Sequence, residues 1–138
     1  MRKPELEHEG TNIKIRATGG REFVTFQGRE FHPEYYSLHK ESTTHDKEHV
    51  VGLIGVGHGV PLEGGEADII TRMLLPLKDG HEVLQSVINN AKQKGRKQVL
   101  ISVFQDRGWI ESMLKKIGIE NKYVPEAEDA GSHIKVEL

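Results

Sequence analysis

The turn at residues 78–83 is the segment in which we expect the principal ligand contact of this chain. A predicted helix begins there, because the apolar residues that follow recur at helical spacing. These residues are Val83, Leu84, Val87, Ile88 and Ala91. Asp79 occupies the expected N-cap position and Glu82 follows three residues later, which is the pattern of a capping box. We therefore expect these two carboxylates to satisfy first-turn N–H groups of the helix.

A second group of residues with possible chemistry is His45-Asp46-Lys47-Glu48-His49, which matches the His-x-x-Glu-His pattern of some zinc proteases. That pattern needs a helix to bring both histidines to one face, whereas a predicted strand begins here at residue 50. In a strand His45 and His49 would still share a face, so a surface metal site is an alternative. A structural role is favoured, and no metal is expected.

Residues 57–66 contain four glycines and one proline, which predicts a loop between two strands. The segment lacks the Gly-Lys-Ser/Thr ending of a phosphate-binding loop. A flexible connection is the favoured interpretation. The alternative is a mobile lid beside a binding site, with His58 as the residue to test.

The N-terminal half predicts antiparallel β structure. Residues 1–11 are polar and expected to be frayed, and alternation over residues 13–16 predicts a short strand. Residues 21–31 predict a hairpin that turns at Gln27-Gly28, and a further strand is expected at residues 35–39.

The C-terminal half predicts a βαβα unit with two further strands. A strand–helix–strand crossover of this length implies a parallel pair of strands. Glycines at Gly95 and Gly118 are expected to end the two helices, and Asp106 is expected to cap the second. The predicted strands lie at residues 50–56, 68–75, 98–104, 123–124 and 133–138, and the predicted helices follow residues 79 and 106.

Composition excludes several classes of function. The chain has 138 residues, a net charge of −2 and no cysteine, which excludes disulfides and thiolate chemistry. A nucleic-acid partner is not expected without a basic excess, and the cluster Lys92, Lys94, Arg96 and Lys97 is interpreted as a solvated helix end. No apolar run approaches the roughly 18 residues of a membrane span, and no secretory signal precedes the polar start. The expected location is the cytoplasm.

Four stretches of the C-terminal half occur in a characteristic order. They are the apolar strand at residues 50–56, the strand at 69–75 ending at Pro76, the helix end and strand at 91–104, and Leu114 to Ile119. Their order and spacing, over about half of the chain, resemble the GNAT N-acetyltransferase superfamily. The resemblance implies an α+β fold with a GNAT-like mixed sheet, in which an antiparallel N-terminal half is followed by a βαβα unit.

The resemblance also implies acetyl-CoA as cofactor and places it along residues 74–83. Backbone N–H groups at the helix start would hold its diphosphate, and the end of the preceding strand would bond to the pantetheine arm. Glu48 or His49 would be the general base for the amine. The implied cofactor contacts are Leu74, Leu75, Lys78, Asp79, Gly80, His81, Glu82 and Val83.

Some family positions carry other residue types in this chain. Glu82 and Leu84 replace glycines, the carboxylates of Asp79 and Glu82 would repel a diphosphate, and Leu114 replaces a proton-donating tyrosine. Two hypotheses follow for a single domain spanning residues 1–138. The first is an acetyltransferase for a small amine, with weak or lost activity. The second is a non-enzymatic module that binds a protein partner or a nucleotide-like ligand. A homodimer formed through an exposed edge at residues 134–138 is also conceivable.

Overall fold

The computed structural model describes residues 13–20, 22–41, 48–76, 79–103, 107–125 and 132–138. Their main feature is a mixed sheet of seven strands. In spatial order these are β1 (Ile13–Ala17), β4 (Glu34–Glu41), β5 (Glu48–Leu62), β6 (Gly65–Leu74), β7 (Gln98–Ser102), β9 (His133–Glu137) and β8 (Lys122–Val124). Two further strands, β2 (Val24–Phe26) and β3 (Arg29–Phe31), pair with each other as a separate hairpin.

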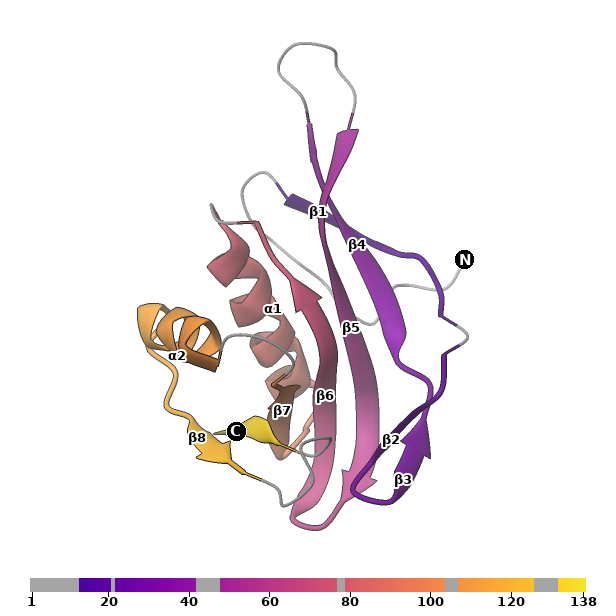
Figure 1. The fold of residues 1–138 in the computed structure, drawn as a ribbon, viewed down its shortest axis with the longest axis vertical. Coiled ribbons are helices and arrows are strands. Elements are labelled where there is room, and N and C mark those ends of the chain that lie inside the picture. Colours follow the sequence, from indigo (N-terminus) through magenta and orange to yellow (C-terminus); the bar gives the residue numbers. More distant parts are fainter. Residues whose placement is uncertain (1–12, 21, 42–47, 77–78, 104–106, 126–131) are drawn as a thin grey trace.

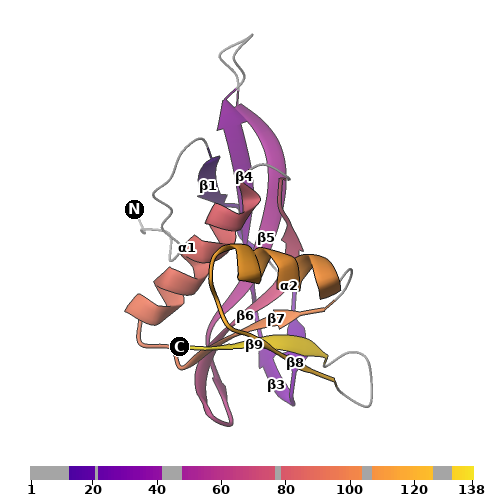
Figure 2. The ribbon, with the colours of Figure 1, turned by 90° about the vertical axis from the view of Figure 1, so that its left-hand side faces the viewer.

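Both helices cover the same face of the sheet, and the β2–β3 hairpin lies on the opposite face (Figures 1 and 2). Helix α1 (Gly80–Gln93) turns the predicted apolar stripe toward the sheet, and α2 (Arg107–Lys116) buries Ile110 and Leu114. The main core lies between these helices and the sheet. A smaller core lies beneath the hairpin and contains Phe26, Val60, Ala67, Ile69 and Leu100.

Strand pairing confirms the predicted fold class. All neighbouring pairs in the sheet are antiparallel except β6 and β7, which are parallel and joined by α1. This is the antiparallel half followed by a βαβα unit that the GNAT resemblance implied. The predicted glycine stops are also confirmed, since Gly95 and Gly118 have φ of 78° and 74° at the two helix ends.

The edge predicted at residues 134–138 is wrong in its first part. Strand β9 pairs with β7 over residues 133–137 and with β8 over residues 133–135, so only the described residues after Lys135 make no ladder pair on the β8 side. The short strand β8 had too little apolar alternation to reveal that it takes the outer position. The edges of the sheet are β1 and β8.

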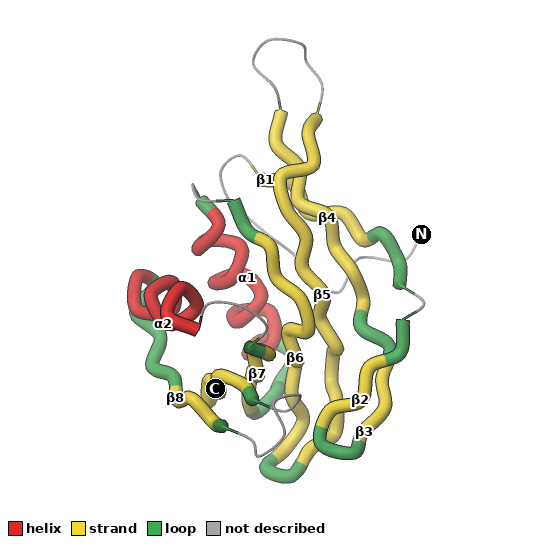
Figure 3. The backbone as a smooth tube through the Cα atoms, in the orientation of Figure 1, coloured by secondary structure: helices red, strands yellow, loops and turns green. Residues whose placement is uncertain are grey.

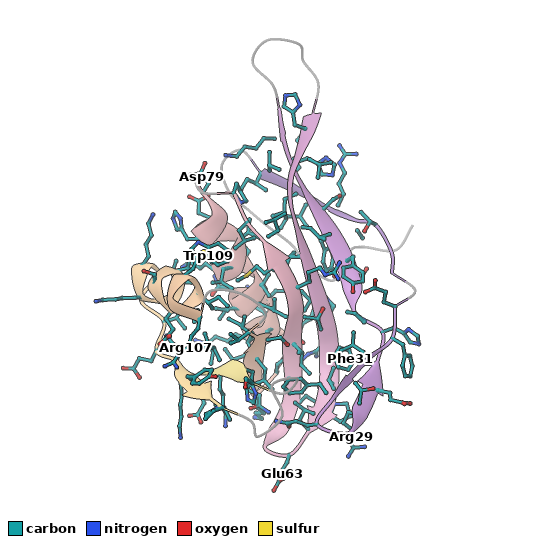
Figure 4. All side chains as sticks on the ribbon, in the orientation of Figure 1. Arg29, Phe31, Glu63, Asp79, Arg107 and Trp109 are labelled. Carbon is teal, nitrogen blue, oxygen red and sulfur yellow. The ribbon has the colours of Figure 1, made fainter. Side chains whose placement is uncertain are left out.

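The loop predicted at residues 57–66 is also wrong. Strand β5 continues to Leu62 and β6 begins at Gly65, so only Glu63 and Gly64 form the turn (Figure 3; Glu63 is labelled in Figure 4). Gly57 lies within β5. The residue is a glycine because the ring of Phe31 packs directly onto its backbone, where any side chain would overlap the ring. Gly57 thus makes room for the hairpin, whereas Gly59 and Gly65 lie against the side chains of Arg96 and Lys97.

Replacing Gly57 with alanine is expected to lower the free energy of unfolding by about 1–3 kcal/mol, the usual cost of forcing an extra carbon into a packed site. The added methyl group would displace the Phe31 ring. Chemical denaturation of the single variants Gly57→Ala and Phe31→Leu and of the double variant measures the coupling energy between the two positions. The double variant should lose less stability than the sum of the two single changes. Strict additivity would show that the two positions do not meet.

Candidate functional site

Strands β6 and β7 diverge partway along their length. Their parallel pairing runs from Ala67 opposite Gln98 to Ile70 opposite Ile101, although β6 continues to Leu74. The register between β5 and β6 shifts at the same place, and Thr71 is the extra residue of the resulting bulge. Beyond Ile70 the β7-facing edge of β6 therefore makes no ladder pair with β7.

A cavity of about 660 Å³ lies where the strands diverge. Its wall on the helix side includes Trp109 and Ile110 of α2, and its wall on the hairpin side includes Glu22 and Tyr35. Trp109 and Phe31 mark the two sides of the sheet in Figure 4. The cavity thus connects the two faces of the sheet through the gap between β6 and β7. Its other lining residues are Val24, Leu53, Ile70, Thr71, Arg72, Met73, Leu74 and Ser102.

The polar part of the cavity lies on the hairpin side. The Tyr35 hydroxyl donates a hydrogen bond to Glu22 Oε2 over 2.5 Å. Burial, followed by this hydrogen bond, raises the pKa of Tyr35, so its phenol stays protonated at neutral pH. The hydroxyl of Thr71, a residue only 6% exposed, is close enough to the Tyr35 phenol to lower its pKa but makes no well-formed hydrogen bond with any described residue. A buried polar atom of this kind is available to a ligand.

The start of α1 differs from the predicted capping box. Asp79 has φ of 69° and its side chain makes no cap hydrogen bond, so that prediction is wrong. A capping side chain requires an extended N-cap backbone, and the left-handed conformation instead places the carboxylate 3.6 Å from Lys40 Nζ. Only the backbone oxygen of Asp79 contributes, accepting from Glu82 N over 3.1 Å. The Asp79 carboxylate does not occupy the first-turn N–H groups.

The predicted cofactor contacts form a path away from the cavity. Leu74 lines the cavity and is 60% exposed, whereas Leu75 is buried beside the helix start. Gly80 allows this close approach, because a Cβ there would lie 2.9 Å from Leu75 Cβ. Val83 is buried in the core, His81 and Glu82 are half-buried in the first turn of α1, and Lys78 lies outside the described residues.

The predicted general bases lie elsewhere. Glu48 pairs in register with Glu41 and His49 with Lys40, near the projecting end of the β4–β5 hairpin (Figure 1). His49 is four residues from the cavity-lining Leu53, about 13 Å along an extended strand. Among the described side chains, His49 is not part of the cavity lining.

The predicted metal pattern finds no support within the described residues. His45 lies outside them, and the rest contain no group of three His, Asp or Glu side chains placed to hold a metal ion. No helix in this part of the chain has the length and apolar character needed to cross a membrane.

A buried polar network occupies the sheet beside the end of α1. Asp68 is completely buried, and its carboxylate accepts from Arg96 Nε over 2.8 Å and from Gly59 N over 2.9 Å. It also lies 3.1 Å from His58 Nδ1, and His58 Nε2 lies 2.7 Å from the Tyr36 hydroxyl. Burial would raise the pKa of Asp68, but the hydrogen bonds from His58, Gly59 and Arg96 outweigh it and lower the pKa.

This network corrects two predictions. His58 belongs to a buried structural cluster and cannot serve on a mobile lid. Arg96 is not part of a solvated basic end, because its side chain is only 15% exposed and pairs with Asp68. The β-bulge between Gly57 and Val60 turns His58 and Gly59 toward Asp68. Arg96 binds the same carboxylate.

Sequence patterns missed the residues that line the polar side of the cavity. Glu22, Tyr35, Arg72 and Trp109 line the cavity but belong to none of the sequence motifs. They converge because of the bulge at Thr71 and the divergence of β6 from β7. Pro76, which stops the β6 strand, was the one sequence signal close to this place.

Comparison with known proteins gives a likeness of fold. No protein-family profile matches the sequence, and no curated protein matches it. A domain from Methanocaldococcus jannaschii DSM 2661 is similar in structure, with a TM-score of 0.56 and 12% identity over 77% of this chain and 67% of that chain. An acetyltransferase of the GNAT family from Staphylococcus aureus Mu50 has a TM-score of 0.48 and 14% identity, over 77% of this chain and 68% of that one. The first of these likenesses shows a shared fold.

Proposed function

We propose that this GNAT-like domain binds acetyl-CoA where β6 and β7 diverge and transfers its acetyl group to a small amine. The observation that carries this proposal is the cavity that joins the two faces of the sheet. A thioester entering from the helix side would meet an amine entering from the hairpin side. The two reactants would thus approach from opposite directions, as a direct transfer requires.

Local features of the chain fit such a co-substrate. The edge of β6 beyond Ile70 makes no ladder pair with β7, so it presents backbone groups to an amide-bearing arm such as pantetheine. Leu74 lines the cavity, and six residues farther on α1 begins at Gly80. The Asp79 carboxylate is directed to Lys40, so it does not compete with an anionic group such as a diphosphate for the N–H groups at the start of α1.

Acetyl-CoA supplies an acyl group activated as a thioester. On the hairpin side, the Glu22 carboxylate attracts the ammonium form of the acceptor and takes one proton from it, which frees the nitrogen lone pair for attack on the thioester. As the C–N bond forms and the C–S bond breaks, the nitrogen loses a second proton. One of the two protons ends on the departing sulfur as a thiol, and the other passes to solvent. The protonated phenol of Tyr35 holds Glu22 in place through their 2.5 Å hydrogen bond, and so acts as a positioning residue.

A module that binds acetyl-CoA without transferring its acetyl group is the second candidate. It is favoured by Leu114, which is completely buried in the core and has no proton to donate to a leaving thiolate. The two candidates share the cavity and differ only in turnover. Incubation with acetyl-CoA and a panel of small amines, followed by detection of free thiol, separates them.

Acetyl-CoA is expected to bind saturably and to change the fluorescence of Trp109, the single tryptophan of the chain and part of the cavity wall. Ser102→Phe should weaken this binding at least about tenfold, because the ring would fill the space between the diverging strands. Calorimetry provides the affinities independently of fluorescence.

Ser112→Phe is the matched control, since Ser112 is exposed on α2 and does not line the cavity. It should leave the affinity unchanged. Equal weakening by both substitutions would contradict the assigned path. Absence of binding to the unmodified chain at millimolar acetyl-CoA would overturn both candidate functions.

A further inference from the structure

Building on the proposed function, we infer that the amine acceptor is a zwitterion, namely a free α-amino acid with an apolar side chain. Its ammonium group would face Glu22 and its carboxylate would face Arg72. Both residues line the cavity on the hairpin side of the sheet, away from the helices.

Arg72 is the first support for a carboxylate-bearing acceptor. It is exposed at the cavity, and no carboxylate oxygen of the described residues lies within 4.0 Å of its side chain. Arg96 and Arg107, in contrast, pair with Asp68 and Glu111. A guanidinium group beside a cavity and without an internal anion suits a carboxylate, which it can bind through two parallel hydrogen bonds.

The shape of the sheet brings the opposite charges to one place. Arg72 lies opposite Gly55 in the β5–β6 register. A Cβ at Gly55 would lie 2.7 Å from the Tyr35 ring and 2.9 Å from Thr71 Oγ1, so both side chains converge over this glycine. Tyr35 in turn holds Glu22. The positive charge of Arg72 also acts on the phenol, lowering the pKa of Tyr35 against the larger effects of burial and Glu22.

The two charges are close to the same phenol without neutralising each other. Glu22 and Arg72 form no ion pair within 4.0 Å. A ligand with a single charge would satisfy only one of them, whereas the two ends of an amino acid would satisfy both. Thr71 adds a buried hydroxyl that makes no well-formed hydrogen bond with any described residue. Val24 and Leu53, on the same side of the sheet, provide an apolar wall for the side chain of the acceptor.

Three compounds of similar shape separate the contributions that the ammonium group and the carboxylate of the ligand make to binding. L-Leucine carries both, L-leucinamide lacks the carboxylate, and 4-methylpentanoate lacks the ammonium group. Binding to the chain without acetyl-CoA is followed through Trp109 fluorescence and calorimetry, and acetyl transfer is then measured with each amine. We expect L-leucine to bind at least about tenfold more tightly than either analogue, because each charge-assisted contact contributes at least that factor.

Arg72→Gln should weaken L-leucine binding to the level of L-leucinamide and leave L-leucinamide unchanged. Arg72→Lys, which keeps the charge but not the paired hydrogen bonds, should give an intermediate affinity. Arg29→Gln is the matched control, because Arg29 is exposed on the hairpin and does not line the cavity. It should change neither affinity. Thermal unfolding of each variant establishes that it is folded.

The outcomes distinguish this inference from the proposed function. Transfer to L-leucine and L-leucinamide with equal efficiency, before and after Arg72→Gln, would overturn the amino-acid inference and leave acetyl transfer standing. If the chain bound L-leucine through Arg72 but did not bind acetyl-CoA, the proposed acetyl transfer would be overturned and the amino-acid site would stand. Equal affinities for all three compounds in the unmodified chain would also overturn the inference.

Discussion

Replacing Asp68 with asparagine is expected to lower the free energy of unfolding by about 3 kcal/mol, the lower end of the cost of removing one partner from a buried ion pair. The Asp68 carboxylate is completely buried and accepts hydrogen bonds from Arg96 and from the backbone of Gly59, with His58 also in contact. An amide in its place would turn an NH₂ group toward one of these donors and leave Arg96 with only its longer, more exposed contact to Glu66, at 3.7 Å. The midpoint of chemical denaturation at pH 7 measures the loss.

The pH dependence of the same variant provides a second readout. Because the pKa of Asp68 is lowered in the folded state, its contribution to stability is complete above the ordinary aspartate range. This contribution is lost as the pH falls through the lowered folded pKa. The unmodified chain should therefore lose stability on acidification more steeply than Asp68→Asn. Parallel curves would contradict the role assigned to the carboxylate.

Asp79→Asn is the matched control for Asp68. Asparagine tolerates the left-handed backbone at this position, and the ion pair with Lys40 is partly exposed. The loss of stability should stay below about 1 kcal/mol, as is usual for an exposed pair. If both substitutions were equally harmful, burial of Asp68 would not be the source of its effect.

Glu22→Gln is expected to lower acetyl transfer by about 100-fold or more, the usual contribution of a general base. Glutamine keeps a hydrogen-bond acceptor for the Tyr35 hydroxyl but cannot take up the proton of the amine. Turnover of acetyl-CoA with an amine acceptor at neutral pH, followed through the release of free thiol, measures the loss.

Two further variants test this assignment. Glu30→Gln changes an exposed glutamate on the hairpin that does not line the cavity, and it should leave turnover unchanged. Tyr35→Phe should give a smaller loss than Glu22→Gln, since the phenol positions the carboxylate and does not accept the proton. An equal effect of Glu22→Gln and Glu30→Gln would rule out Glu22 as the base.

The order of elements could be predicted because it depends on local patterns. The apolar stripe after Val83 and the left-handed glycines at Gly95 and Gly118 act within a few residues, and the structure confirms them. Residues 57–62 show where such reasoning fails. Their glycines suggested a loop, but the contact of Gly57 with Phe31 depends on a hairpin more than twenty residues earlier in the chain.

The polar cavity depends even more on distant contacts. Glu22, Tyr35 and Arg72 come from three separate parts of the chain and meet because β6 carries a bulge and separates from β7. No single-sequence pattern encodes such a divergence. The turn after Leu74 could be predicted as a helix start, but the direction of the Asp79 side chain could not, because it follows from a left-handed backbone angle.

The interior position of β9 has a consequence for the time at which this domain can fold during synthesis. Residues 133–137 leave the ribosome later than strands β1 to β8. They must nevertheless enter the sheet between β7 and β8. Until then β7 presents an unpaired edge, a state in which nascent chains are prone to associate with one another. Translation rate and chaperone supply should therefore influence the yield of folded protein more strongly here than in a sheet whose last strand is added at the rim.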